Sequence, residues 1–247
     1  MTRAEVAKLY GKLAKAMPEP RSELEFRDPY QLLVAVILSA QATDRSVNRV
    51  TESLFREAPT PESMLALGEA WLRKRIREIG LANGKARNIV ATSRALLERH
   101  GGTVPAERAA LEALPGVGRK TANVVLNVAF GQPTIAVDTH VFRVANRTGL
   151  APGKDVREVE RLLLAATPKR FLQHAHHYLI LHGRHVCKAR KPDCPACPIA
   201  EMCAYPDKVS EQDAAPASPV TASRAKAGPA TAPSVTAALR GSRPQRK

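Results

Sequence analysis

The sequence predicts an all-α fold, and three observations support this. Segments with helical hydrophobic periodicity fill most of the first 207 residues. The one segment that reads as a strand, Thr134 to Val137, is too short to build a sheet. The chain has 247 residues, of which 44% are hydrophobic, so it can bury one sizeable core or two small ones.

Capping signals indicate where the first helices begin. Thr2 and Glu5 have the spacing of a capping box, and Asp28-Pro29 places an N-cap before a proline at the first helical position. The segment behind that proline is apolar on nearly all sides, which indicates a buried central helix. Asp44 is expected to cap the amphipathic helix that follows.

Glycines indicate where later helices end, since Gly80 and Gly101 each follow a helical segment at the position that favours a left-handed residue. The expected helices, in chain order, are Thr2 to Met17, Tyr30 to Gln41, Asp44 to Glu57, a short helix from Thr60, Glu69 to Ile79, Lys85 to His100, Glu107 to Leu114, Arg119 to Phe130, Thr139 to Thr148, Val156 to Ala166 and Pro168 to Leu181.

The chain is strongly basic. It carries 38 Lys and Arg against 23 Asp and Glu, a net charge of +15, and its isoelectric point is about 10.1. A field of this sign concentrates polyanions, so nucleic acid is the first candidate partner and an anionic membrane surface the second. The longest apolar run, Leu32 to Leu38, is far too short to cross a bilayer, and residues 1–17 lack the apolar block of a signal peptide. We therefore expect a cytoplasmic protein without membrane attachment.

Residues 208–247 differ in composition from the rest of the chain. They are rich in Ala, Pro, Ser and Thr and have almost no large apolar side chains, so they are expected to form a disordered tail. They carry seven Lys and Arg and two Asp and Glu, a net of +5 out of the total of +15, which leaves +10 for residues 1–207. The basic character therefore belongs to the folded part as well as to the tail.

The segment Leu114 to Thr121, with the sequence LPGVGRKT, connects two expected helices. Gly116 and Gly118 can adopt positive φ and let the backbone approach a ligand, and the helix behind them exposes unpaired N–H groups. With Arg119 beside it, this arrangement favours binding of a phosphate without reading the base. A simpler interpretation is a tight connection between helices with no ligand.

The four cysteines of the chain, Cys187, Cys194, Cys197 and Cys203, lie within seventeen residues. Clustered cysteines in an intracellular protein indicate a metal site rather than disulfides. The spacing by itself leaves a structural zinc and an iron–sulfur cluster equally open. Lys191, in the first cysteine loop, is a candidate phosphate contact or an ordinary solvated side chain.

The hairpin and the residues after it, Lys120 to Val125, resemble the endonuclease III family of helix-hairpin-helix base-excision repair enzymes. The family pattern also appears in the segments LSAQATD, at Leu38 to Asp44, and VDTHVFR, at Val137 to Arg143. The resemblance covers roughly residues 1–206. It implies a [4Fe–4S] cluster on the four cysteines and a fold of two helical domains with damaged double-stranded DNA bound in the cleft between them.

The resemblance also implies domain boundaries and a reaction. Residues 1–21 and 133–207 would form an iron–sulfur cluster domain, and residues 22–132 a helical barrel containing the hairpin. The implied activity is that of a monomeric DNA glycosylase and abasic-site lyase that removes oxidised pyrimidines. Lys120 corresponds to the lyase nucleophile of the family, and Asp138 to its catalytic aspartate. A base must leave the stack for this chemistry, and Gln41 and Leu81 correspond to the residues that enter the helix.

The residues also permit simpler interpretations. A lysine in a DNA-binding protein usually contacts phosphate, although the helix dipole and neighbouring cations favour the neutral, nucleophilic form of Lys120. Asp138 precedes a helix and can be an N-cap, a role compatible with catalysis. His140 is a candidate contact to the sugar-phosphate or a packing residue.

Three rival functions remain at this stage. The first is an adenine-removing mismatch glycosylase on the same scaffold, a family that lacks the lyase lysine and has an added C-terminal domain. The second is a non-enzymatic DNA-binding or redox-sensing iron–sulfur protein, and the third is a zinc-bound structural module. Strand cleavage at an abasic site separates the expected enzyme from the second of these.

Overall fold

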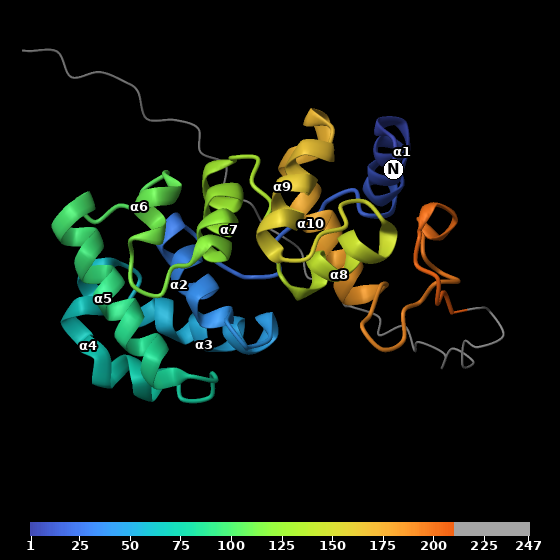
Figure 1. The fold of residues 1–247 in the computed structure, drawn as a ribbon. Coiled ribbons are helices and arrows are strands. Elements are labelled where there is room, and N and C mark those ends of the chain that lie inside the picture. The colour runs from blue at the N-terminus through green and yellow to red at the C-terminus, as the bar shows by residue number, and fades with distance from the viewer. Residues whose placement is uncertain (210–247) are drawn as a thin grey trace, which may run out of the picture. The chain divides into compact units, whose positions relative to one another are not determined.

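The computed structural model describes residues 1–209, and these residues form α-helices and one 3₁₀ turn but no β-strand (Figure 1). The all-α prediction is therefore confirmed. The tail expected over residues 208–247 lies, apart from its first two residues, outside the described part of the chain. The helices are α1 (Arg3–Ala16), α2 (Pro29–Ser39), α3 (Asp44–Glu57), α4 (Pro61–Arg75), α5 (Ala82–His100), α6 (Arg108–Glu112), α7 (Arg119–Phe130), α8 (Thr139–Thr148), α9 (Val156–Ala166) and α10 (Lys169–His185), followed by the 3₁₀ turn η1 (Ala200–Met202).

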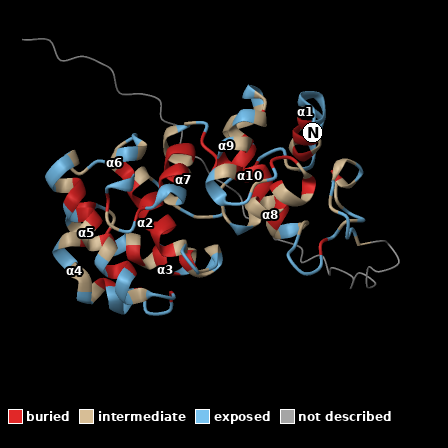
Figure 2. Cartoon of the chain, viewed as in Figure 1, coloured by how far each residue is buried: buried red, intermediate tan, exposed pale blue. Residues whose placement is uncertain are grey.

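The buried apolar side chains form two clusters. One draws its members from Tyr30 to Leu126, on helices α2 to α7, and we call this part the hairpin lobe. The other comes from α1, the segment after α7, helices α8 to α10 and Ile199, and we call it the cysteine lobe. Figure 2 shows buried residues on the inner faces of the helices in both lobes. Both clusters belong to one compact unit, so the expected domain boundaries stay a prediction.

The central helix of the hairpin lobe is α2, as its composition predicts. Asp28 caps it by accepting a hydrogen bond from the backbone N–H of Gln31 at 2.9 Å, and Pro29 occupies the first helical position. Residues 30–38 are all buried, and the helix contacts α3, α5 and α7. An apolar helix of this kind gains its stability from burial on every side. None of the helices within residues 1–209 is both long and apolar enough to cross a membrane.

The segment Thr134 to Val137 is a buried connection between α7 and α8 instead of a strand. Side chains of α7 satisfy its backbone: Asn127 donates from Nδ2 to the Thr134 carbonyl at 3.1 Å, and Asn123 donates to the Ile135 carbonyl at 3.3 Å. Because these amides supply the partners that a neighbouring strand would provide, the segment needs no sheet.

Several helix ends differ from the sequence-based expectation. The cap of α3 is Thr43, whose hydroxyl accepts from the N–H of Ser46, while the Asp44 carboxylate forms an ion pair with Arg184. Helix α4 is interrupted at Gly68, where φ is 77°, so the expected short helix and its successor meet at this kink.

The helix ends near residues 75–82 and 181–185 also differ from the positions expected from the sequence. Helix α4 ends at Arg75 rather than next to Gly80, and α5 starts at Ala82, three residues before the expected Lys85. Helix α10 continues four residues past Leu181, to His185, because the side chain of His182 is buried in the cysteine lobe. The C-cap at Gly101 is confirmed, with φ at 57°.

Candidate active site and cysteine centre

The hairpin between α6 and α7 is a tight turn that requires one of its two glycines. Gly116 has a φ of 77°, and a Cβ there would lie 2.8 Å from the Asn88 side chain, so no other residue fits. The expectation of positive φ is wrong for Gly118, which is extended at φ −97°. Gly118 is the N-cap of α7 and has no side chain to accept the first N–H groups of that helix. The helix therefore begins with free donors, as an anion site requires.

Lys120 is the second residue of α7 and its side chain is exposed. It lines a cleft whose walls come from both lobes. The hairpin lobe contributes side chains of α2, α3 and α7, and the cysteine lobe contributes α10. The cleft residues are Arg21, Ser22, Glu23, Leu24, Val36, Ser39, Asp44, Lys120, Val124, Val128, His176, His177, Ile180, Leu181 and Arg184.

Asp138 is the N-cap of α8, as one interpretation of the sequence predicts. Its Oδ1 atom accepts hydrogen bonds from the N–H groups of His140 at 2.9 Å and Val141 at 2.8 Å. Both bonds end on the same oxygen. The cap therefore fixes the carboxylate while the second oxygen, Oδ2, stays available for another partner.

The buried His176 of α10 lies within electrostatic range of both candidate catalytic residues. Burial and, to a smaller extent, the charge of His177 lower the pKa of His176 to about 3. The charge of Asp138 acts in the opposite direction, and that of Lys120 acts in the same direction as burial. Lys120 and Asp138 therefore both lie close enough to this imidazole to act on it, although they belong to different helices and different lobes.

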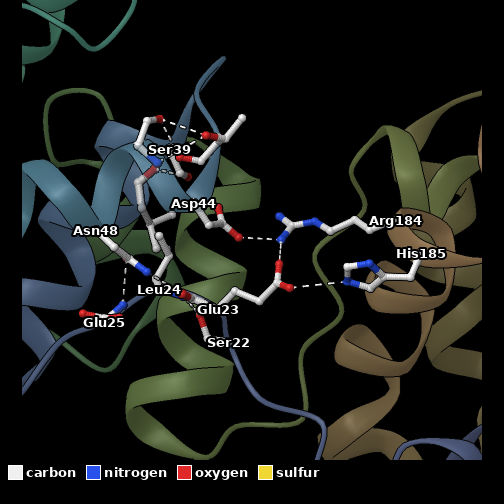
Figure 3. A network of polar contacts seen from close by, with 12 residues as sticks. Ser22, Glu23, Leu24, Glu25, Ser39, Asp44, Asn48, Arg184 and His185 are labelled. Carbon is white, nitrogen blue, oxygen red and sulfur yellow. Dashed lines mark hydrogen bonds and ion pairs between the residues drawn. The ribbon is translucent and has the colours of Figure 1, made fainter. Parts of the chain in front are cut away.

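An ion network joins the two lobes at the edge of the cleft (Figure 3). The guanidinium of Arg184, on α10, forms ion pairs with Asp44 at the start of α3 and with Glu23. His185 lies 3.4 Å from the same Glu23 carboxylate. His140 lines a neighbouring depression together with Asp44 and Arg184, so the structure brings this predicted residue to the same edge.

The predicted phosphate contact Arg119 has a protein partner. Its Nε and Nη2 atoms donate to the two carboxylate oxygens of Glu160, on α9, at 2.8 and 2.9 Å. Glu160 is only 4% exposed, whereas 44% of the Arg119 side chain remains exposed. This bidentate pair holds the start of α7 against the cysteine lobe.

Gln41 and Leu81 share an unusual backbone conformation. Within residues 1–209 they are the two non-glycine residues with positive φ, at 56° and 63°. Such left-handed residues are uncommon and concentrate at functional sites. The Leu81 side chain is 61% exposed, and a Cβ on Gly80 would lie 3.6 Å from the Gln41 carbonyl oxygen, so the two turns are adjacent.

The four cysteines line one cavity and form no disulfide. Burial and, to a smaller extent, the neighbouring cysteines raise the pKa of Cys197 to about 11. Metal ligation requires the deprotonated form of cysteine, so binding of a cationic centre would release protons here. Such a donor set fits a metal group.

The chemistry of this donor set does not by itself choose the metal group. Four cysteines can hold a [4Fe–4S] cluster, with one thiolate on each iron, or a single zinc ion. Arg147 closes the loop by donating to the carbonyls of Lys188 and Ala189 at 2.8 Å, and its Nη1 lies 3.7 Å from Cys187 Sγ. Lys191 is exposed on the same loop.

Sequence reasoning missed His176, Glu160 and Arg184. The α10 segment HAHHYLILHGRH shows an unusual density of histidines, and that was the available signal for His176. Glu160 and Arg184 pair with residues 41 and 140 positions away, so no local pattern marks them.

Residues 34–169 match the HhH-GPD superfamily of base excision DNA repair proteins, and residues 187–203 match the iron–sulfur binding domain of endonuclease III. The fold, the hairpin and the cysteine loop therefore define a helix-hairpin-helix base-excision repair protein. The chain is 56% identical to the endonuclease III of Escherichia coli strain K12 over 209 residues, which cover 85% of this chain and 99% of that protein. The endonuclease III of Haemophilus influenzae is 55% identical over the same length.

Among solved structures, a trapped endonuclease III–DNA covalent intermediate is similar to this chain with a TM-score of 0.78 and 46% identity, covering 82% of this chain and 96% of that one. The chain belongs to the endonuclease III family. It is a DNA glycosylase and abasic-site lyase of base-excision repair with a [4Fe–4S] cluster, and its four cysteines lie within the matched iron–sulfur binding domain. The zinc alternative and the non-enzymatic alternatives are thereby set aside.

Proposed function

We propose that Lys120 is the nucleophile of this enzyme. Neutral Nζ bonds to C1′ of the damaged nucleotide while the bond from C1′ to the base breaks and the base leaves. Opening of the sugar ring gives a Schiff base, which withdraws electrons from C2′. Loss of the C2′ proton then breaks the bond from C3′ to oxygen, and the 3′ phosphate leaves. The position of Lys120, exposed in a cleft at the uncapped end of α7, supports this role.

Asp138 has the complementary role in this proposal. Its cap bonds hold Oδ1, so Oδ2 can stabilise positive charge that develops on the sugar and can accept the proton that Nζ loses as it bonds to C1′. The charges of both residues act on His176, which supports a shared reaction centre. The [4Fe–4S] cluster held by the four cysteines supplies a structural centre for the loop that carries Lys191.

The substrate in this proposal is double-stranded DNA with oxidised pyrimidines or abasic sites, bound by a monomer in the cytoplasm. Gly116, Gly118, Arg119, His140 and Lys191 contact the sugar-phosphate backbone. Gln41 and Leu81 enter the duplex, and their adjacent left-handed turns support this assignment. The trapped covalent intermediate of endonuclease III with DNA is a related protein's complex, and it supports the same substrate class here.

The proposal is tested with purified protein and duplexes that contain thymine glycol, an abasic site or an adenine mismatch. Cleavage of the first two duplexes by β-elimination and borohydride trapping of a covalent adduct are expected. Lys120→Ala should lower strand cleavage by about 10³-fold or more and abolish the adduct. The control is Lys15→Ala, which removes an equal charge from an exposed position on α1. Undiminished trapping in Lys120→Ala would show that another amine is the nucleophile.

A further inference from the structure

The two left-handed turns that carry Gln41 and Leu81 meet at one buried lysine. Lys85 is only 5% exposed, although it lies in the first turn of α5 and follows an exposed segment. Burial lowers the pKa of Lys85. A lysine is almost never buried without partners, so its contacts indicate what holds it there.

The Lys85 ammonium binds the turn that contains Gln41. Nζ donates to the carbonyl of Leu38 at 2.9 Å and to the carbonyl of Ala40 at 2.5 Å. These are carbonyls at the end of α2, which have no partner within the helix. The dipole at a helix C-terminus also favours a cation. The second bond reaches the residue directly before Gln41, and therefore holds the peptide that enters the left-handed turn.

The backbone of the same residue binds the other turn. The N–H of Lys85 donates to the Leu81 carbonyl at 3.0 Å, which closes the first turn of α5 behind the left-handed Leu81. One residue thus hydrogen-bonds to both turns, one through its side chain and the other through its main chain. The two turns and Gly116 of the hairpin also line one open groove.

We propose that Lys85 is a positioning residue that fixes the Gln41 and Leu81 turns relative to each other, so that the two side chains enter a duplex as a unit. This inference rests on the proposed function, because it requires Gln41 and Leu81 to contact DNA. If the two strained turns moved independently, each would have to become ordered when DNA binds. This ordering would lower the rate of the reaction. The buried ammonium removes that freedom before binding.

The test is a double-mutant cycle on a duplex that contains thymine glycol, measured under single-turnover conditions. Lys85→Met keeps the length of the side chain and removes its donors and charge, and Lys15→Met is the matched control for charge. Lys85→Met should lower the single-turnover rate by about tenfold, while Lys15→Met should not change it. In a background of Gln41→Ala with Leu81→Ala, the further loss caused by Lys85→Met should largely disappear.

An equal loss in both backgrounds would overturn the proposal, because Lys85 would then act without the two side chains. A wild-type rate in Lys85→Met would also overturn it. If Lys85→Met does not fold, the same cycle is run with Lys85→Gln, whose amide can still donate to one carbonyl, and the same non-additivity is expected. Failure of the proposed function is distinguishable, because wild-type protein would then cleave neither thymine glycol nor abasic duplexes. Full activity of the Gln41→Ala, Leu81→Ala protein would show that the reaction does not need these two side chains to contact DNA. It would therefore overturn the role of Lys85 but leave the proposed lyase activity intact.

Discussion

The N-termini of α7 and α8 each present one catalytic candidate, and they are built in opposite ways. Helix α7 starts at Gly118, which offers no side-chain acceptor, so its first N–H groups remain open beside Lys120. Helix α8 starts at Asp138, whose Oδ1 accepts two N–H groups. The positive end of the α7 dipole is thus available to an external anion, whereas that of α8 is compensated by the protein's own carboxylate.

The difference assigns a task to each end. An open helix end can bind the phosphate of a passing duplex without sequence preference. A capped end holds its carboxylate at a fixed place, where it can act on a sugar. The Arg119–Glu160 pair joins the start of α7 to the cysteine lobe, so the open end is held firmly although its own N–H groups are not capped.

The largest effect is expected from separating the two roles of Asp138. Asp138→Asn keeps a capping oxygen but removes the charge, so turnover on abasic duplexes should fall by about 10²–10⁴-fold while the melting temperature hardly changes. Asp138→Ala removes the cap as well and should cost about 1 kcal/mol, or roughly 2–4 °C in melting temperature. Kinetics and calorimetry on the two variants measure both quantities. If Asp138→Asn turns over at the wild-type rate, the carboxylate is merely a cap.

A smaller effect is expected from making the α7 end resemble the α8 end. Gly118 is extended and nothing lies within 4 Å of a Cβ placed there, so Gly118→Ser fits and can accept from the first N–H groups of α7. The variant should gain ~0.3 kcal/mol in stability, because glycine is already a fair cap. It should bind an abasic-analogue duplex about threefold more weakly, because its hydroxyl competes with the phosphate for the N–H groups.

Gly118→Ala is the matched control for that experiment, since it adds a Cβ without an acceptor. Fluorescence anisotropy at two salt concentrations measures affinity for both variants. Equal affinities of the serine and alanine variants would show that the open N–H groups do not bind phosphate.

The sequence predicted the open and capped ends because their determinants are local. The N-cap at Asp138 and the capping box of Thr2 and Glu5 each depend on residues within a few positions, whereas the glycine at position 116 is also required by the distant Asn88 side chain. The cap of α3 was misassigned to Asp44, because the sequence does not show that this carboxylate is taken by Arg184, 140 residues away.

Most of the remaining differences also come from distant partners. The buried contacts of Lys85 and Glu160 cross 45 and 41 residues, so tertiary packing decides them. The family resemblance indicated Lys120 and the four cysteines, but the influence of both helix ends on the His176 imidazole required the structure. Local patterns thus predicted the helices, and long-range packing determined how their ends face each other.

The last comparison concerns stability rather than activity and uses His176, whose pKa responds to the charges at both helix ends. Its pKa of about 3 lies below the ordinary value near 6.5, so the neutral ring stabilises the fold above pH 6.5, and this contribution is lost as the pH falls from there toward 3. The free energy of unfolding should fall by about 1.4 kcal/mol per pH unit from this residue between pH 6 and pH 4, and His176→Gln should remove that slope. Denaturant unfolding at several pH values measures this dependence, and equal slopes in wild type and His176→Gln would contradict the assignment.

Proton NMR tests the same comparison directly. Lys120→Ala should raise the pKa of His176, and Asp138→Asn should lower it further.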